Sequence, residues 1–419
     1  MADTSQLEDL GALWSERPYH RRWLWQQADG LFDFFQYRSV NPKGGFNDLD
    51  RSGQPLNAAA QVRPIHIAGR MVHCFSIASL LGRPGADDIV DHGMTWLWNH
   101  HRDTKNGGYF WSLNDSGPVD SSKQGYGHAF VLLAASSAKL AGHPLADRML
   151  ADVTEILNEK FWEEKHGAIA EEFNADWSDI DGGAYRGQNS NMHLTEALMA
   201  AYEATGERAY LEKAERIADL VIRRCAGSVG WRVAEHFTRD WEIDKNYRGN
   251  EMFRPSGTTP GHWLEWARLV LQLWSLGGKR HDWMPEAAKG LFSQSMVLGW
   301  DKEKGGFFYT LDWDDAPAKR LKLWWPASEG AGAAHFLNQH CPDAFHEQSY
   351  RQIWGIIANA FLDHDHGGWH EELTEDLRPA STIFPGKGDI YHALQACLIP
   401  LYPADGSLTK MIPQTGGRL

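Results

Sequence analysis

Residues 257–266 read Gly-Thr-Thr-Pro-Gly-His-Trp-Leu-Glu-Trp, a pattern typical of a loop that turns abruptly into a helix. Pro260 suits the first helical position, because the N–H that proline lacks would be unpaired there. His262 then falls in the first turn, and Glu265 and Trp266 follow on the same helical face. An imidazole, a carboxylate and an indole at a helix start predict a site for a small polar ligand. A single histidine here is also compatible with a helix cap or a satisfied core residue.

Other predicted helix starts carry similar groups. His193 ends the run 189–193, and His392 ends the run 389–392. Helix N-termini disfavour imidazolium, so these histidines are expected to be neutral and able to exchange acid and base roles across a substrate. Arg70 would stabilise a developing oxyanion. The candidate set is His193, His262 and His392 with Arg70, Asn189, Glu265 and Glu329. Its chemistry is proton abstraction beside a sugar carbonyl, as in aldose–ketose isomerisation or epimerisation.

Three other interpretations compete with this chemistry. Three histidines and a glutamate can bind a metal, although the HExxH spacing is absent and positive helix ends oppose a cation. Glu265 and Glu329 could be the paired carboxylates of a glycosidase, which does not call for three histidines. A non-catalytic sugar-binding or protein-binding barrel would not need the histidines either. We therefore favour metal-free, cofactor-independent proton transfer.

A glycine turn repeats along the chain and indicates which elements position these residues. The turns end at Gly45, Gly108, Gly167, Gly230, Gly306 and Gly368, about 60 to 76 residues apart. Between them the apolar residues follow a helical period, as in Leu211, Ala214, Ile217 and Val221. Each unit therefore holds two helices, and six units predict a closed, all-α (α/α)6 barrel of six helical hairpins. We expect one barrel domain over residues 17–404, with 1–16 and 405–419 as terminal extensions.

Composition excludes several classes of protein. The 419 residues are 42% hydrophobic, as in ordinary globular proteins, and the formal net charge of -14 argues against nucleic-acid binding. The four cysteines form no CxxC pair, so we expect no disulfide framework. No signal region or apolar run of membrane-spanning length is present, and a cytoplasmic protein is expected.

Several motifs together resemble the N-acylglucosamine 2-epimerase superfamily, and most closely its aldose–ketose isomerase branch. They are Arg70-Met71-Val72-His73, Ser122-Lys123-Gln124-Gly125-Tyr126, Asn191-Met192-His193, residues 259–266 and Asp389-Ile390-Tyr391-His392. The resemblance covers roughly residues 17–404. It implies an (α/α)6 barrel and a reaction through a cis-enediol without metal or organic cofactor.

The resemblance also implies residue roles. His262 and His392 match the acid/base pair, His193 a residue that binds substrate and assists, and Arg70 a contact to sugar hydroxyls. Glu265 matches a glutamate that supports its neighbouring histidine. Further pocket positions are matched by Asn189, Trp325 and Glu329.

Two positions bear on the substrate expected from the resemblance. Sulfoquinovose isomerases hold the sulfonate with two glutamines, and here Glu371 and Gly388 stand in their places. A carboxylate would repel a sulfonate, which favours a neutral C6 hydroxyl; the alternative is that Glu371 points away from the pocket. We expect interconversion of D-mannose and D-fructose, extending to D-lyxose and D-xylulose. Sulfoquinovose isomerase and a sugar 2-epimerase of the cellobiose or N-acylglucosamine type are the alternatives. The expected partner is a monosaccharide, bound by a monomer or homodimer.

Overall fold

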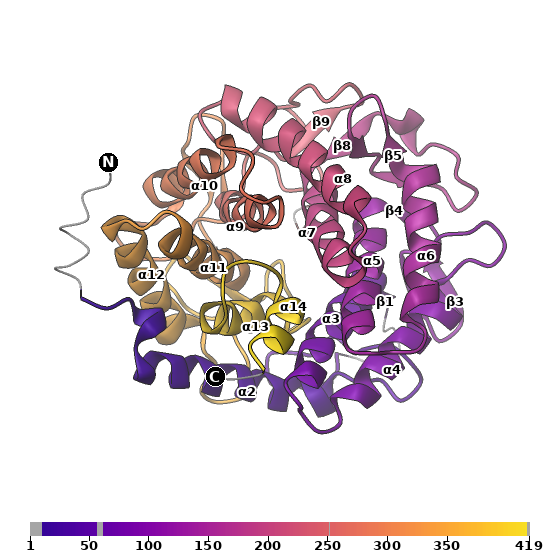
Figure 1. Cartoon of the computed structure of the whole chain (residues 1–419), viewed down its shortest axis with the longest axis horizontal. Coiled ribbons are helices and arrows are strands. Elements are labelled where there is room, and N and C mark those ends of the chain that lie inside the picture. Colours follow the sequence, from indigo (N-terminus) through magenta and orange to yellow (C-terminus); the bar gives the residue numbers. More distant parts are fainter. Residues whose placement is uncertain (1–10, 57–61, 251, 417–419) are drawn as a thin grey trace.

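The computed structural model describes residues 11–56, 62–250 and 252–416, which form two concentric rings of helices (Figure 1). The inner ring consists of α3 (Ile65–Leu80), α5 (Gly125–Leu140), α7 (Gln188–Thr205), α9 (Pro260–Leu276), α11 (Trp324–His340) and α13 (Tyr391–Leu398). The outer ring consists of α2 (Pro18–Arg38), α4 (Ala86–Trp96), α6 (Ala146–Ile156), α8 (Arg208–Ala218), α10 (Trp283–Gln294) and α12 (Ala344–Ile356). The (α/α)6 barrel expected from the sequence is confirmed.

Burial distinguishes the two rings. Every residue of α9 from Pro260 to Leu273 is buried, because both faces of an inner helix contact protein. The outer helix α8 buries one stripe instead, formed by Tyr210, Leu211, Ala214, Ile217 and Ala218. The hydrophobic core therefore fills the space between the rings.

The ring closes between the two ends of the chain. Five hairpins join consecutive inner and outer helices, from α3–α4 to α11–α12. The sixth inner helix, α13, packs instead against α2, the first outer helix, and it also contacts α3 and α11. The last hairpin is therefore assembled from residues far apart in sequence.

The glycine turns found in the sequence follow the six outer helices. Their glycines have positive φ, for example 68° at Gly45 and 77° at Gly306, which glycine adopts at little cost. Five outer helices reach their turns through a wider π-helical segment: Leu97–His101, Leu157–Phe161, Asp219–Ala226, Ser295–Gly299 and Ile357–Phe361. Three short 3-10 segments are Trp14–Glu16, Asp181–Gly183 and Ile399–Leu401.

Short strands lie in the loops that lead to the inner helices. They are β1 (Arg63–Pro64), β2 (Ser112–Asn114), β3 (Gly117–Asp120), β4 (Lys123–Gln124), β5 (Trp162–Glu163), β6 (Ala168–Ile169), β7 (Glu172–Phe173), β8 (Tyr185–Gly187), β9 (His236–Thr238), β10 (Thr310–Leu311), β11 (Pro317–Lys319), β12 (Lys322–Leu323) and β13 (Glu372–Leu373). The segment before each inner helix pairs antiparallel with the next loop around the ring: β1–β2, β4–β7, β8–β9, Thr258–Leu311, β12–β13 and Lys387–Leu49. These pairings fix the loops over one end of the barrel.

Buried ion pairs tie three of these loops to the inner helix starts. Lys123, Lys322 and Lys387 pair with Asp103, Asp301 and Asp363 at 2.8, 2.9 and 2.7 Å. Each lysine lies a few residues before the start of an inner helix, and each aspartate is the first residue of a glycine turn. All six side chains are at most 4% exposed, so each charge relies on its partner.

The segment after residue 404 is not separate from the barrel. Residues Leu408–Gln414 form α14, which packs on α3 and α5 and buries Leu408, Met411 and Ile412. The domain boundary expected at residue 404 stays a prediction. Residues 1–10 and 417–419 lie outside the described structure. Within the described residues, no helix combines the length and apolar character needed to cross a bilayer.

Candidate active site

A cavity of about 360 Å³ opens at the end of the barrel where the inner helices begin. Its volume suits a small molecule such as a monosaccharide. Eight of the nine residues predicted for the site line it: Arg70, Asn189, His193, His262, Glu265, Trp325, Glu371 and His392. The ninth, Glu329, lies behind His392. Trp266 was expected to lie on the ligand-facing side of α9, but it is fully buried and does not line the cavity.

His262 is held by a carboxylate that the sequence did not indicate. Both oxygens of Glu235 lie 2.9 Å from Nδ1 of His262. The indole of Trp266 donates to Oε1 of Gln188, which turns the Gln188 amide nitrogen towards Glu235 at 2.9 Å. Burial acts to raise the pKa of Glu235, but its contacts with His262 and Gln188 hold that pKa below its usual range. Ionised Glu235 only accepts, so Nδ1 carries the proton and Nε2 is the basic nitrogen.

Glu265 was expected to support a neighbouring histidine, and the ring that it approaches is not that of His262. Glu265 lies 3.7 Å from Nδ1 of His193 instead. The spacing of three residues places Glu265 and His262 along the same cavity wall, but it does not decide which ring the carboxyl reaches.

His392 has an equivalent arrangement on the opposite side of the ring. Its Nδ1 lies 2.8 Å from Oε1 of Glu329, whose Oε2 accepts from Nε of Arg268 at 2.9 Å. Burial alone would raise the pKa of Glu329, yet Arg268 and His392 hold it below its usual range. Burial lowers the pKa of His392 despite this carboxylate, so the ring is neutral near pH 7. Its Nδ1–H donates a hydrogen bond to the ionised Glu329.

Trp325 connects the two histidines. Its ring centroid is 4.8 Å from that of His262 and 6.0 Å from that of His392. Gly261 makes this packing possible, because a Cβ there would come within 2.4 Å of the Trp325 ring. The Trp325 ring thus gives a steric reason for a glycine directly before His262, in addition to its place at the helix start.

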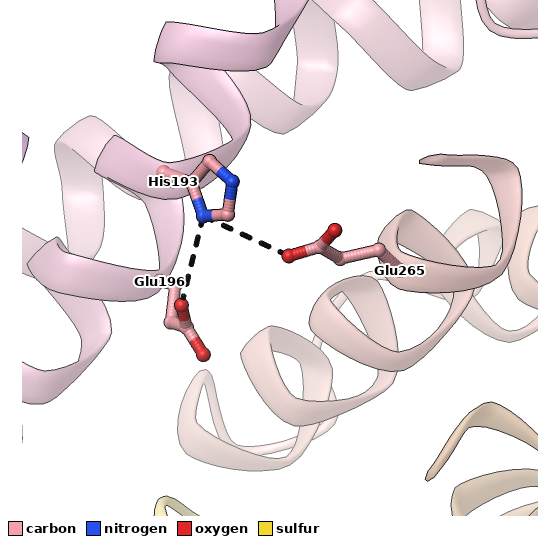
Figure 2. A group of neighbouring side chains, drawn as sticks. All are labelled: His193, Glu196 and Glu265. Carbon is pink, nitrogen blue, oxygen red and sulfur yellow. Dashed lines mark ion pairs between the residues drawn. The ribbon is translucent and has the colours of Figure 1, made fainter. Parts of the chain in front are cut away.

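His193 lies on the floor of the cavity, between two carboxyl groups (Figure 2). Its Nδ1 is 3.9 Å from Glu196 on the same helix and 3.7 Å from Glu265, which comes from α9. Neither contact is a hydrogen bond, and Nδ1 is buried without a hydrogen-bond partner among the described residues. Burial lowers the pKa of His193 to about 4, so this ring too is neutral near pH 7.

Arg70 is fixed by contacts on two sides. Its guanidinium donates to Asp389 at 2.8 Å and to the Tyr126 hydroxyl at 2.9 Å, and it lies over the rings of Phe130 and Tyr391. Arg70 is only 8% exposed, yet it lines the cavity. A cation held rigidly in this way can stabilise negative charge on a bound oxygen without reorganising.

Three carboxyl groups gather on the wall near Arg70. Glu371 and Asp48 line the cavity beside Asp389, and the Gly388 N–H donates to Glu371 at 2.7 Å. Burial and the charge of Asp389 raise the pKa of Glu371 well above its usual range, and they raise that of Asp48 to about 6. Glu371 faces the cavity as expected, but its raised pKa suppresses its negative charge. The sequence argument assumed an ionised Glu371 that repels a sulfonate, and this premise is corrected.

Comparison with known proteins now places the chain. Residues 44–396 match the model of the N-acylglucosamine 2-epimerase (GlcNAc 2-epimerase) family. The chain belongs to this family. It is 41% identical over 406 residues to a D-mannose isomerase of Pseudomonas cannabina pv. alisalensis, covering 95% of this chain and 96% of that one. Identity to a D-mannose isomerase of Thermobifida fusca is 40% over 412 residues, covering 96% and 100%. A crystal structure of a D-mannose isomerase superposes with a TM-score of 0.85 at 31% identity, covering 91% and 97%.

The charge balance beneath the cavity bears on whether this member of the N-acylglucosamine 2-epimerase family needs a metal. Among the described residues, donor atoms of His193, Glu196 and Glu265, and those of Glu265, Glu329 and His392, lie within 4.8 Å of one another. Arg268 already brings a cation to both groups, with Nη2 3.6 Å from Glu196 and Nε 2.9 Å from Glu329. A divalent ion would meet this fixed positive charge. Metal-free chemistry stays a prediction, and Arg268 supports it.

Sequence reasoning missed several residues of this family member's site. Glu235, Gln188 and Glu196 lie beside the histidines, and Arg268 binds Glu329 behind His392. Glu235 comes from a loop, and Glu196 and Arg268 come from deeper helix turns. None follows the pattern of polar groups at helix starts except Gln188, the first residue of α7. Glu235 precedes β9 by one residue, so its position was detectable only as a charged residue beside a strand.

Proposed function

We propose that this protein is a D-mannose isomerase that interconverts D-mannose and D-fructose by proton transfer between histidines and the open-chain sugar. The observation that carries the chemistry is that His262 and His392 face one cavity, each with Nδ1 held by a carboxylate at 2.8–2.9 Å. Two imidazoles presented in this way can remove and return protons near pH 7. Similarity to D-mannose isomerases along nearly the whole chain supports the substrate.

The reaction needs two net proton movements. One imidazole takes the proton from C2, the C–H electron pair forms the C1–C2 double bond, and O1 gains a proton to give the cis-enediol. Return of a proton to C1 and loss of the O2 proton then give the ketose. His262 and His392 are the proposed acid/base pair, and Trp325 spans them as a flat surface for the sugar. His193, Arg70 and Asn189 would bind the hydroxyls; in the part of the chain that the structure describes, Oδ1 of Asn189 is buried and has no hydrogen-bond partner.

A neutral C6 end of the substrate fits the wall formed by Asp48, Glu371 and Asp389. Because Asp389 is paired with Arg70, its carboxylate stays ionised, and Asp48 ionises near pH 6. An anionic C6 substituent would approach these charges, whereas a hydroxyl can donate to them. We propose a neutral aldohexose, with D-lyxose as the shorter analogue.

The test is to follow D-mannose in deuterated buffer by NMR. D-fructose carrying deuterium at C1 should accumulate ahead of any epimeric aldose, before and after dialysis against a chelator. The variants His262→Ala and His392→Ala should each lose at least about a hundred-fold in turnover, whereas His364→Ala, in an exposed loop, serves as the control. Earlier formation of D-glucose would indicate an epimerase, and near-wild-type turnover of either variant would remove that histidine from the pair.

A further inference from the structure

Three glutamates from neighbouring inner helices lie beneath the cavity, and two of them contact the same arginine, Arg268. Glu329 of α11 is bound to Arg268 at 2.9 Å and to His392 at 2.8 Å. Glu196 of α7 accepts from the Tyr391 hydroxyl and lies 3.6 Å from Arg268. Both therefore have polar partners that favour the ionised form.

Glu265 of α9 is the third carboxyl and lacks such partners. It is 1% exposed, lines the cavity, and its Oε1 is buried without a hydrogen-bond partner among the described residues. One of its oxygens lies within 4.8 Å of an oxygen of Glu329. Two carboxylates this close in a dry site resist ionising together. Because Glu329 accepts hydrogen bonds from Arg268 and His392, the proton belongs on Glu265.

The other groups around Glu265 do not reverse this assignment. Arg268 and, more distantly, Arg70 favour ionisation, whereas Glu329 and Glu196 oppose it. His193 and His392 are neutral, and the buried hydroxyls of Tyr126 and Tyr391 bear no charge. Burial first, and then Glu329, raise the pKa of Glu265 well above its usual range.

Glu265 also has the position that a hydrogen-bond donor to the reacting atoms requires. It follows His262 by one helical turn on α9, lies 3.7 Å from His193, and has an oxygen within 4.8 Å of a ring nitrogen of His392. A carbon reached by both His262 and His392 is therefore near its carboxyl group. Figure 2 shows Glu265 extending from its helix towards His193.

We propose that Glu265 acts as a neutral carboxylic acid whose O–H donates a hydrogen bond to the substrate oxygen that gains negative charge as the enediol forms. The donor role rests on the proposed isomerase function; the protonation state does not. An acid kept neutral in this way stabilises charge in the transition state more than in the ground state.

Two variants separate donation from charge. Glu265→Ala should lower kcat on D-mannose by about a hundred-fold or more, as loss of one oxyanion donor does elsewhere. Glu265→Gln keeps a donor without a charge, and it should lose at most about tenfold, with little change in KM. Equal, severe losses in both variants, with thermal unfolding unchanged, would show that an ionised carboxylate is required and would overturn the proposal.

The protonation state is measured without substrate. Infrared difference spectra of wild type minus Glu265→Gln at neutral pH should contain a carboxylic-acid carbonyl band, and the subtraction removes other protonated carboxyls such as Glu371. The same subtraction with the exposed Glu159→Gln should give a carboxylate band only. A carboxylate band for Glu265 would overturn the proposal. A wild type inactive on every aldose but showing the acid band would refute the isomerase function alone.

Discussion

Glu235 and His262 are joined by contacts of 2.9 Å from Nδ1 to both carboxylate oxygens, although Glu235 lies in the loop before α9 and His262 in its first turn. The pair leaves Nε2 of the imidazole as the basic nitrogen facing the cavity. A second pair, His392 with Glu329, repeats the relationship on α13 and α11. The two histidines are therefore held in the same tautomer by carboxylates from different segments of the chain.

Glu235→Gln should lower kcat on D-mannose by on the order of a hundred-fold, with a smaller effect on KM. The glutamine amide can donate to Nδ1, which favours the tautomer with the proton on Nε2, and that tautomer cannot act as a base. Steady-state kinetics and the pH profile of kcat/KM report the change. The exposed Glu159→Gln is the matched control, and unchanged kcat in Glu235→Gln would show that Glu235 does not position His262.

Discrimination between D-mannose and sulfoquinovose should depend on pH. Asp48 has a pKa raised to about 6, so it is neutral at pH 5 and ionised at pH 8. The preference for D-mannose over sulfoquinovose, measured as the ratio of kcat/KM values, should therefore be larger at pH 8 than at pH 5. At pH 8 it should be on the order of a hundred-fold. Asp48→Asn should flatten this dependence, and Glu371→Gln should change it less because Glu371 retains its proton. Preference of the wild type for sulfoquinovose would contradict the assignment of the C6 end.

Lys322→Met should destabilise the protein by about 3–5 kcal/mol, because it leaves Asp301 buried without its cation. The pair spans 2.9 Å, and Lys322 is wholly buried two residues before Trp324. Urea unfolding measures the free-energy change, and the exposed Lys302→Met should have little effect. A loss no larger than that of the control would mean that the pair does not hold the loop on the barrel.

Glu203→Gln should stabilise the protein at alkaline pH. Burial raises the pKa of Glu203 to about 7, although the backbone N–H of Ser407 donates to it. A carboxyl with a raised folded-state pKa costs stability as pH rises from its unfolded value of about 4.5 to 7, at about 1.4 kcal/mol per pH unit. The difference in unfolding free energy between variant and wild type should therefore be small at pH 4.5 and full at pH 8. The exposed Glu207→Gln should show no such trend, and a pH-independent difference for Glu203 would contradict the assignment.

The sequence by itself determined the repeat and the helix starts. Glycine turns, a helical apolar period and Pro260 before His262 are local signals, since they depend on neighbours within a few residues. They placed the six inner helices and, with their starts, eight residues of the cavity wall. The motifs that carry the family resemblance lie on the same segments.

Only the tertiary structure decided which carboxyl group serves which histidine. Glu265 is three residues from His262 but approaches His193, while Glu235 and Glu329 hold the rings of His262 and His392 from other segments. The closure of the ring by α2 on α13 has the same origin. Helical spacing fixes the face on which a side chain lies. Its partner and its protonation state depend on the distances and burial that arise when helices distant in sequence pack together.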